Sequence, residues 1–170
     1  METGLILPIP EAEPIVADIR KRRDPNAALG VPAHVTALYP FRPYERIGDE
    51  VKDRLGELLA KTPAFEVSFA RVGRFPGVCW LAPEPRAPFD ALTRSLVETF
   101  SDCVPYGGRF GDPTPHLTIA VNGNEGVLDR IERRMRARLA VPLRVRIDTC
   151  ALMALANGAW MERLRFPLGR

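Results

Sequence analysis

The chain has 170 residues, of which 46% are hydrophobic and 26% are charged. These proportions exclude a largely disordered or low-complexity chain, and the length suits one domain with a substantial core. The net charge of +3 is too small for a protein that coats nucleic acid with a broad basic surface. All but three of the basic residues are Arg, however, which suits bidentate phosphate contacts in a local cleft.

The N-terminal segment and the cysteines predict a cytoplasmic protein. Residues 1–8 carry an acid where a signal peptide is basic, and no apolar stretch is long enough to span a membrane. Cys79, Cys103 and Cys150 are odd in number and lack C-x-x-C spacing. We therefore expect buried free thiols, with no disulfide and no zinc site. Nothing in the sequence indicates a cofactor, a membrane or an obligate protein partner.

Strands and helices alternate in the first part of the chain. The patterns predict, in order, a strand over 3–9, a helix over 11–22, a loop over 24–31, a strand between Pro32 and Pro40, and a helix over 47–61. In the last of these helices, apolar residues recur at helical spacing. We interpret that stripe as core.

The rest of the chain repeats this arrangement. The patterns predict a hairpin over 65–81, a helix over 89–100, a Gly/Pro-rich loop over 106–115, a strand over 116–120, a helix over 127–139, a strand over 143–148 and a last strand over 160–168. A turn at Asn157-Gly158 joins the final hairpin. The five arginines of the helix over 127–139 most simply form a solvated face, and tracking of RNA is the minor interpretation.

One short motif occurs twice. In Pro32-Ala33-His34-Val35-Thr36, strand alternation puts His34 and Thr36 on one face. Pro115-His116-Leu117-Thr118 repeats the pattern 82 residues after the first His, and the chain has no other His. Two imidazole–hydroxyl pairs are therefore displayed on two rigid strands.

The surroundings of the two motifs also match. Each His strand precedes an amphipathic helix, a hairpin and a Trp, with Trp80 and Trp160 lying 46 and 44 residues after the respective His. Such a duplication predicts an α+β fold with two similar lobes related by an approximate two-fold axis. The His strands would face each other across a central groove, and residues 1–170 would form a single bilobal domain.

The paired His-x-Thr strands resemble those of the 2H phosphoesterase superfamily, which includes 2′-5′ RNA ligase-like proteins and RNA 2′,3′-cyclic phosphodiesterases. The similar segments are 31–36, 38–41, 73–78, 105–110 and 166–169. This resemblance covers nearly the whole chain. It implies the same bilobal fold, with antiparallel sheets lining the groove and helices outside.

Two imidazoles can serve one phosphoryl group, because one takes a proton from the nucleophile while the other protonates the leaving oxygen. The resemblance implies that His34 and His116 are catalytic and that Thr36 and Thr118 bind the phosphate. It also implies a nucleotide or RNA end as partner, carrying a 2′,3′-cyclic phosphate that is opened to a 2′-phosphate, or a 2′-5′ linkage. Which His is the acid stays open, as does the choice between hydrolase and ligase.

Six residues that flank the motifs are candidates for lining the groove, although packing or surface roles suit them equally well. They are Tyr39, Phe41, Arg42, Arg74, Tyr106 and Arg109. A protein that binds a nucleotide or RNA end in the same groove without turnover is the main alternative. A metal site is disfavoured, because two His without a carboxylate or thiolate rarely hold an ion.

Overall fold

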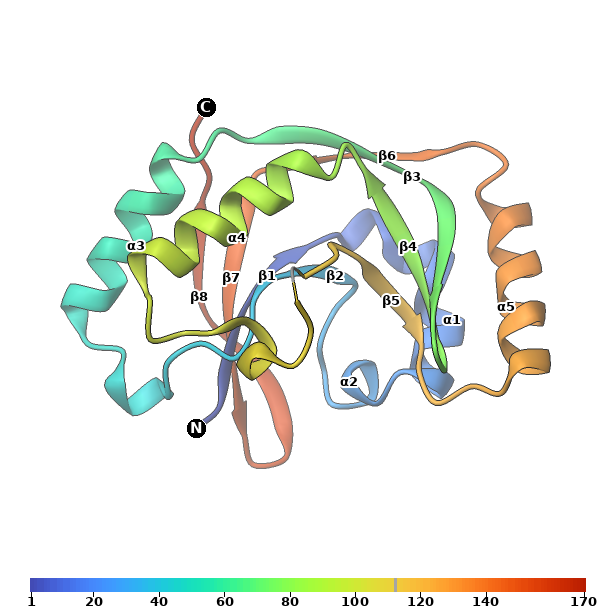
Figure 1. Cartoon of the computed structure of the whole chain (residues 1–170), viewed down its shortest axis with the longest axis horizontal. Coiled ribbons are helices and arrows are strands. Elements are labelled where there is room, and N and C mark those ends of the chain that lie inside the picture. Colours follow the sequence, from blue (N-terminus) through green and yellow to red (C-terminus); the bar gives the residue numbers. More distant parts are fainter. Residues whose placement is uncertain (112) are drawn as a thin grey trace.

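The structure is a computed structural model that describes residues 1–111 and 113–170. It contains two four-stranded antiparallel sheets with helices around them, which confirms the predicted α+β class (Figure 1). The first sheet has the order β2-β1-β7-β8. Its strands are β1 (Thr3–Pro8), β2 (His34–Leu38), β7 (Thr149–Ala156) and β8 (Ala159–Pro167).

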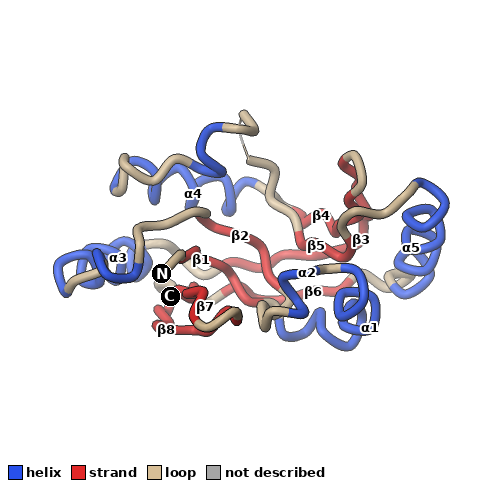
Figure 2. The backbone as a smooth tube through the Cα atoms, turned by 90° about the horizontal axis from the view of Figure 1, so that it is seen from below, coloured by secondary structure: helices blue, strands red, loops and turns tan. Residues whose placement is uncertain are grey.

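The second sheet has the order β5-β4-β3-β6. Its strands are β3 (Phe65–Phe75), β4 (Val78–Glu84), β5 (Leu117–Ala120) and β6 (Leu143–Ile147). The two sheets correspond strand by strand, since β2 and β5, the strands of the two His motifs, each form an edge. These two edges lie next to each other in the middle of the molecule (Figures 1 and 2).

Four longer helices lie outside the sheets and bury one face each, as their apolar spacing predicts. They are α1 (Glu13–Arg23), α3 (Asp49–Lys61), α4 (Ala87–Thr99) and α5 (Glu125–Arg138). The helices α3 and α4 pack on the first sheet, and α1 and α5 pack on the second (Figure 2). Among the described residues, no helix is long and apolar enough to cross a membrane.

Each sheet draws its strands from both halves of the chain. The hairpin β3–β4 follows the first His motif but pairs with the strand of the second, where Trp80 lies opposite Thr118. The hairpin β7–β8 follows the second His motif but pairs with β1 in the first sheet. The sequence repeats are therefore not the two lobes, because each hairpin joins the opposite sheet.

One apolar core continues from the first sheet into the second. Leu7 and Leu152 belong to it from the first sheet, and Leu81 and Leu117 from the second; all four side chains are fully buried. The three cysteines are free and buried, as predicted. Burial raises the pKa of the Cys79 thiol to about 11 and that of Cys150 to about 12, so neither is a ready nucleophile.

Two sequence predictions need correction. The segment predicted as a loop over 24–31 contains a short helix, α2 (Pro25–Ala28), because the Asp24 side chain accepts a hydrogen bond from the Asn26 amide at 3.0 Å and caps it.

The final hairpin does not include residues 143–148, since β6 pairs with β3 in the other sheet. Asn157 and Gly158 have φ values of 51° and 76°, which suit a two-residue turn between directly adjoining strands. The partner of β8 is therefore β7, whose mostly buried run lacks the alternation by which a strand is recognised.

Candidate active site

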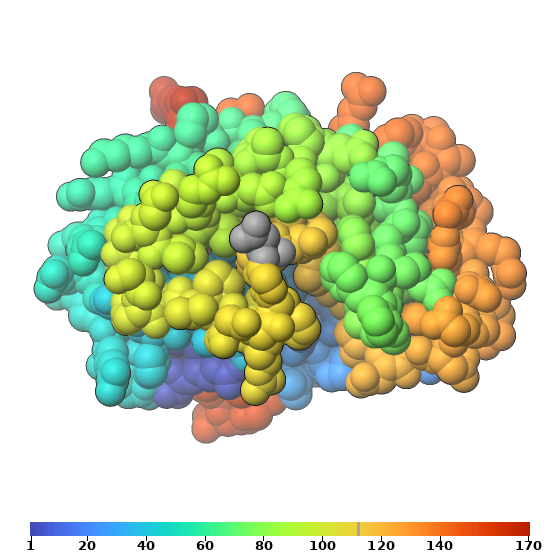
Figure 3. Space-filling model, viewed as in Figure 1, coloured from blue at the N-terminus to red at the C-terminus, as the bar shows by residue number. Residues whose placement is uncertain are grey.

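The edges of β2 and β5 frame a pocket of about 240 Å³. Both His-x-Thr pairs line it, with His34 and Thr36 on one wall and His116 and Thr118 on the other. In the space-filling view a hollow opens between the yellow-orange loop after α4 and the green β3–β4 hairpin (Figure 3). The structure thus brings together the four residues that the sequence singled out.

Strand alternation explains why these four side chains share the pocket. His34 and Thr36 are partly exposed while Val35 between them is fully buried. On β5, Leu117 is likewise buried between His116 and Thr118. The apolar residue of each motif anchors the strand in the core, and its neighbours necessarily point the other way.

A backbone carbonyl two residues upstream holds each imidazole. Nδ1 of His34 lies 2.7 Å from the carbonyl oxygen of Pro32, and Nδ1 of His116 lies 2.6 Å from that of Thr114. A carbonyl oxygen only accepts, so Nδ1 of each ring carries the hydrogen. Nε2 is then the atom that gains or loses a proton in both rings.

Burial lowers the pKa of both histidines. The pKa of His34 falls to about 4 because the ring is removed from water; the Pro32 carbonyl and Asp24 oppose this, while Arg20 and His116 add to it. The pKa of His116 is also lowered by burial, against the Thr114 carbonyl. Both shifts favour the neutral form of the rings near pH 7.

Aromatic rings line the side of the pocket next to β2. The Tyr39 ring lies 6.1 Å from that of Tyr106 and 6.3 Å from that of Trp160, and all three residues line the pocket. The amide of Tyr106 donates to the Tyr39 carbonyl at 2.6 Å. Tyr106 adopts φ 50°, which a non-glycine residue rarely does. Burial raises the pKa of the Tyr106 phenol, and a hydrogen bond with Thr36 partly offsets that rise.

Two further aromatic rings support His116 from behind. The ring of Phe75 stacks on Trp80 at 4.8 Å, and both rings make T-shaped contacts with the imidazole, at 5.3 and 5.8 Å. The indole lies directly over Gly73, where an added Cβ would approach it to 2.3 Å. Glycine at position 73 therefore lets Trp80 lie flat against the sheet.

A buried ion pair supports the chain segment that leads into β2. The guanidinium of Arg20 donates to Asp24 at 2.9 and 3.1 Å and to the Val31 carbonyl at 3.2 Å. Arg20 and Asp24 are only 2% and 3% exposed. The carboxylate of Glu13 accepts from the amide of Ala33 at 2.6 Å. Charged groups thus fix the backbone on the N-terminal side of His34.

Four of the six proposed groove-lining residues are not among those that line the pocket. Phe41 is 5% exposed because it packs edge-on against Phe100 at 5.1 Å in the core. Arg42 turns away to Asp102, to which it donates two hydrogen bonds of 2.9 and 2.7 Å.

Arg74 and Arg109 complete this correction. Arg74 meets three carboxylates of α5, at 2.7 to 3.1 Å, and these charges direct it away from the pocket. Arg109 is exposed in the loop after α4 and is not a lining residue. Tyr39 and Tyr106 are the two that do line the pocket.

Sequence reasoning missed several lining residues. They are Gly4, Ile6, Asp24, Asn26, Val31, Met153 and Trp160. Only Trp160 had a sequence signal, as the counterpart of Trp80 in the repeat. The others lie on β1, on β7, and in residues 24–31 around α2, so their place in the pocket depends on long-range pairing and packing. Within the described chain, no group of three or more His, Cys, Asp or Glu side chains could hold a metal ion.

The family model of the 2′-5′ RNA ligase superfamily matches residues 8–159. The chain therefore belongs to this superfamily of 2H phosphoesterases. No curated protein matches the sequence significantly.

Solved structures share the fold over their full length. The protein TT0787 of Thermus thermophilus aligns with a TM-score of 0.65 at 17% identity, covering 100% of both chains. E. coli LigT in complex with 3′-AMP aligns with a TM-score of 0.60 at 18% identity, covering 99% of this chain and 98% of the other. A structure described as a phosphoesterase gives 0.62 at 17% identity, with the same coverage. The fold is thus that of LigT-like proteins.

Proposed function

We propose that this protein hydrolyses a 2′,3′-cyclic phosphate, on an RNA end or a small nucleotide, and leaves a 2′-phosphate. His34 and His116 are the proton-transfer pair, and Thr36 and Thr118 bind the phosphate. One observation carries the proposal: both His-x-Thr motifs line one pocket, and each Nδ1 is held by a carbonyl. Both Nε2 atoms are thereby left for the reaction.

The reaction needs two proton transfers at one phosphorus. A water oxygen attacks the phosphorus while its proton passes to Nε2 of the neutral His. The bond from phosphorus to the ribose O3′ breaks, and O3′ takes the proton from Nε2 of the protonated His. The threonine hydroxyls donate to the non-bridging oxygens, where negative charge grows in the transition state. The same scheme with a 5′-hydroxyl in place of water forms a 2′-5′ phosphodiester.

The aromatic side of the pocket supports a nucleotide as the substrate class. Tyr39, Tyr106 and Trp160 offer ring faces and edges beside the phosphate-binding groups, and nucleobases stack on such side chains. Among the structural neighbours, E. coli LigT has been crystallised with 3′-AMP, ATP and NADP+. These ligands are nucleotides, which is the class proposed for this pocket.

A substrate screen tests the proposal. The four 2′,3′-cyclic mononucleotides and a short RNA ending in a cyclic phosphate are incubated with the protein, and the products are identified by phosphorus NMR. We expect 2′-phosphates. A 3′-phosphate would mean that the ribose binds in the opposite orientation. Binding of these compounds without turnover, at any pH, would replace the catalytic proposal by the binding-protein alternative.

A further inference from the structure

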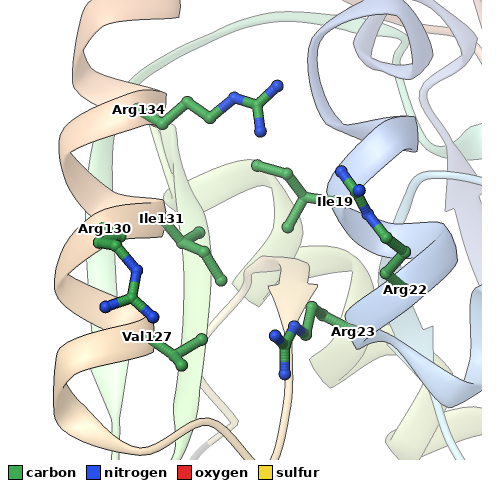
Figure 4. A pocket seen from close by; sticks show the side chains of 7 residues that line it. All are labelled: Ile19, Arg22, Arg23, Val127, Arg130, Ile131 and Arg134. Carbon is green, nitrogen blue, oxygen red and sulfur yellow. The ribbon is translucent and has the colours of Figure 1, made fainter.

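A second concave surface, distinct from the pocket, lies between α1 and α5. It is a groove of about 500 Å³ with an apolar floor of Ile19, Val127 and Ile131. Its remaining lining residues are Arg22, Arg23, Arg130 and Arg134. Figure 4 shows side chains from both helices directed toward the space between them. We call this surface the arginine groove.

Part of the positive charge of the groove is uncompensated. No acidic residue is among those that line it. Asp18, near one end, accepts hydrogen bonds from Arg134 and Arg138, both at 2.7 Å, and forms an ion pair with Arg22 at 4.0 Å, so the charges of Arg22 and Arg134 are compensated in part. Arg23 and Arg130 are exposed, and neither has an ion pair or side-chain hydrogen bond within the part of the chain that the structure describes. Such a surface attracts an anion.

The spread of the charges favours a chain of phosphates over one small anion. Arg130 and Arg134 lie one helical turn apart, about 6 Å along the axis of α5, and Arg22 and Arg23 line the α1 side of the groove. Between the two rows, the isoleucines and the valine offer an apolar surface to sugars and bases. A charged groove that follows a backbone, combined with apolar contacts, is typical of single-stranded nucleic acid binding.

The groove also adjoins the catalytic pocket. Arg23 lines the groove and the next residue, Asp24, lines the pocket. The amide of Val121, just past the end of β5, donates to the Arg23 carbonyl at 2.8 Å. The strand β5 begins directly after His116, and its four residues span about 13 Å. The same strand thus connects His116 with the end of the groove.

We propose that the arginine groove binds the phosphate backbone of the RNA whose cyclic-phosphate end occupies the pocket. The cyclic phosphate is the 3′ end, so the groove takes nucleotides on its 5′ side. This inference rests on the proposed function and specifies its substrate as an RNA chain rather than a mononucleotide. RNA is favoured over an acidic protein because the adjoining pocket is proposed to take a ribonucleotide end.

Two charge-matched double variants test the groove. Arg23→Gln/Arg130→Gln removes the two unpaired groove cations, and Arg133→Gln/Arg144→Gln removes two exposed cations that do not line the groove. Both lower the net charge by the same amount, so a difference between them reports the groove itself. Binding of a fluorescent single-stranded RNA of about ten nucleotides with a terminal 2′-phosphate is measured by anisotropy at several salt concentrations.

We expect the groove variant to weaken RNA binding about tenfold at low salt and to reduce the slope of log K against log salt by about 1.4, or 0.7 for each lost phosphate contact. The control should change binding less than about threefold. Equal effects of the two variants would overturn the inference. Polyglutamate binding that depends on Arg23 and Arg130, without RNA binding, would overturn it in favour of an acidic protein partner.

Turnover separates this inference from the proposed function. The groove variant should raise KM for an RNA with a cyclic-phosphate end and leave kcat/KM for a 2′,3′-cyclic mononucleotide unchanged. If the wild type turns over both substrates and the groove variant keeps the wild-type KM for RNA, the RNA-binding role of the groove alone is refuted. Weakened RNA binding in the variant, with no turnover by the wild type, would refute the catalytic proposal and keep the groove as an RNA site.

Discussion

The buried ion pair beside the pocket makes a quantitative prediction about stability. Arg20→Met leaves the Asp24 carboxylate, 3% exposed, without the guanidinium that donates to it at 2.9 and 3.1 Å. Removing one partner of a buried pair costs about 3–5 kcal/mol, a large part of the roughly 5–15 kcal/mol that stabilises a domain. With a slope of about 2 kcal/mol per molar urea, the unfolding midpoint should fall by about 1.5–2.5 M.

A double-mutant cycle isolates the pair. Asp24→Asn removes the charge but keeps an amide oxygen that can cap α2, and the double variant removes both charges. We expect the double variant to be more stable than the sum of the single effects predicts, by about 2 kcal/mol. Arg22→Met is the control, because that side chain is 68% exposed and should matter by less than about 0.5 kcal/mol. Additive single effects, or a loss below about 1 kcal/mol for Arg20→Met, would refute the reasoning.

Three predictions concern the pocket. His34→Ala and His116→Ala should each lower kcat by about 10²–10⁴-fold with an unchanged urea midpoint. Thr36→Ala or Thr118→Ala should lower kcat by less. If a His variant unfolds more easily but its native fraction keeps full turnover, that His has a structural role. Burial lowers the pKa of both histidines, that of His34 to about 4, so kcat/KM should follow a bell with its maximum below pH 6.5. On the acid side of the maximum the general base becomes protonated, and on the alkaline side the general acid loses its proton. A maximum above about pH 7 would contradict the lowered pKa values. EDTA should leave turnover unchanged, whereas a loss restored by a divalent ion would replace the two-histidine mechanism.

Local patterns allowed most of the elements, and the four motif residues, to be predicted from the sequence. Alternation along a strand depends only on the chain itself, so His34 with Thr36, and His116 with Thr118, could be assigned to common faces. Helical spacing is equally local, and it gave α3, α4 and α5 to within a few residues.

Pairing over long distances could not be predicted in the same way. The arginines near the motifs show this, because a guanidinium is directed by the carboxylates it meets. Asp102 lies 60 residues from Arg42, and Glu125 lies 51 from Arg74. The exchange of hairpins between the sheets is a similar case, since either hairpin presents an apolar face that either sheet could bury. The sequence repeat follows chain order, so it indicates two similar lobes but not which hairpin joins which sheet.

Both His motifs lie at sheet edges, and the carbonyls that hold the imidazoles come just before the paired part of each strand. Pro32 lies before the first paired residue of β2, and Thr114 before that of β5, so their carbonyls are available to the two Nδ1 atoms. The same edges face each other, which removes the rings from water and lowers both pKa values. The lowered pKa values favour the neutral form of both rings. In the proposed reaction, the negative charge of the phosphate opposes this shift and favours protonation of the His that serves as the acid.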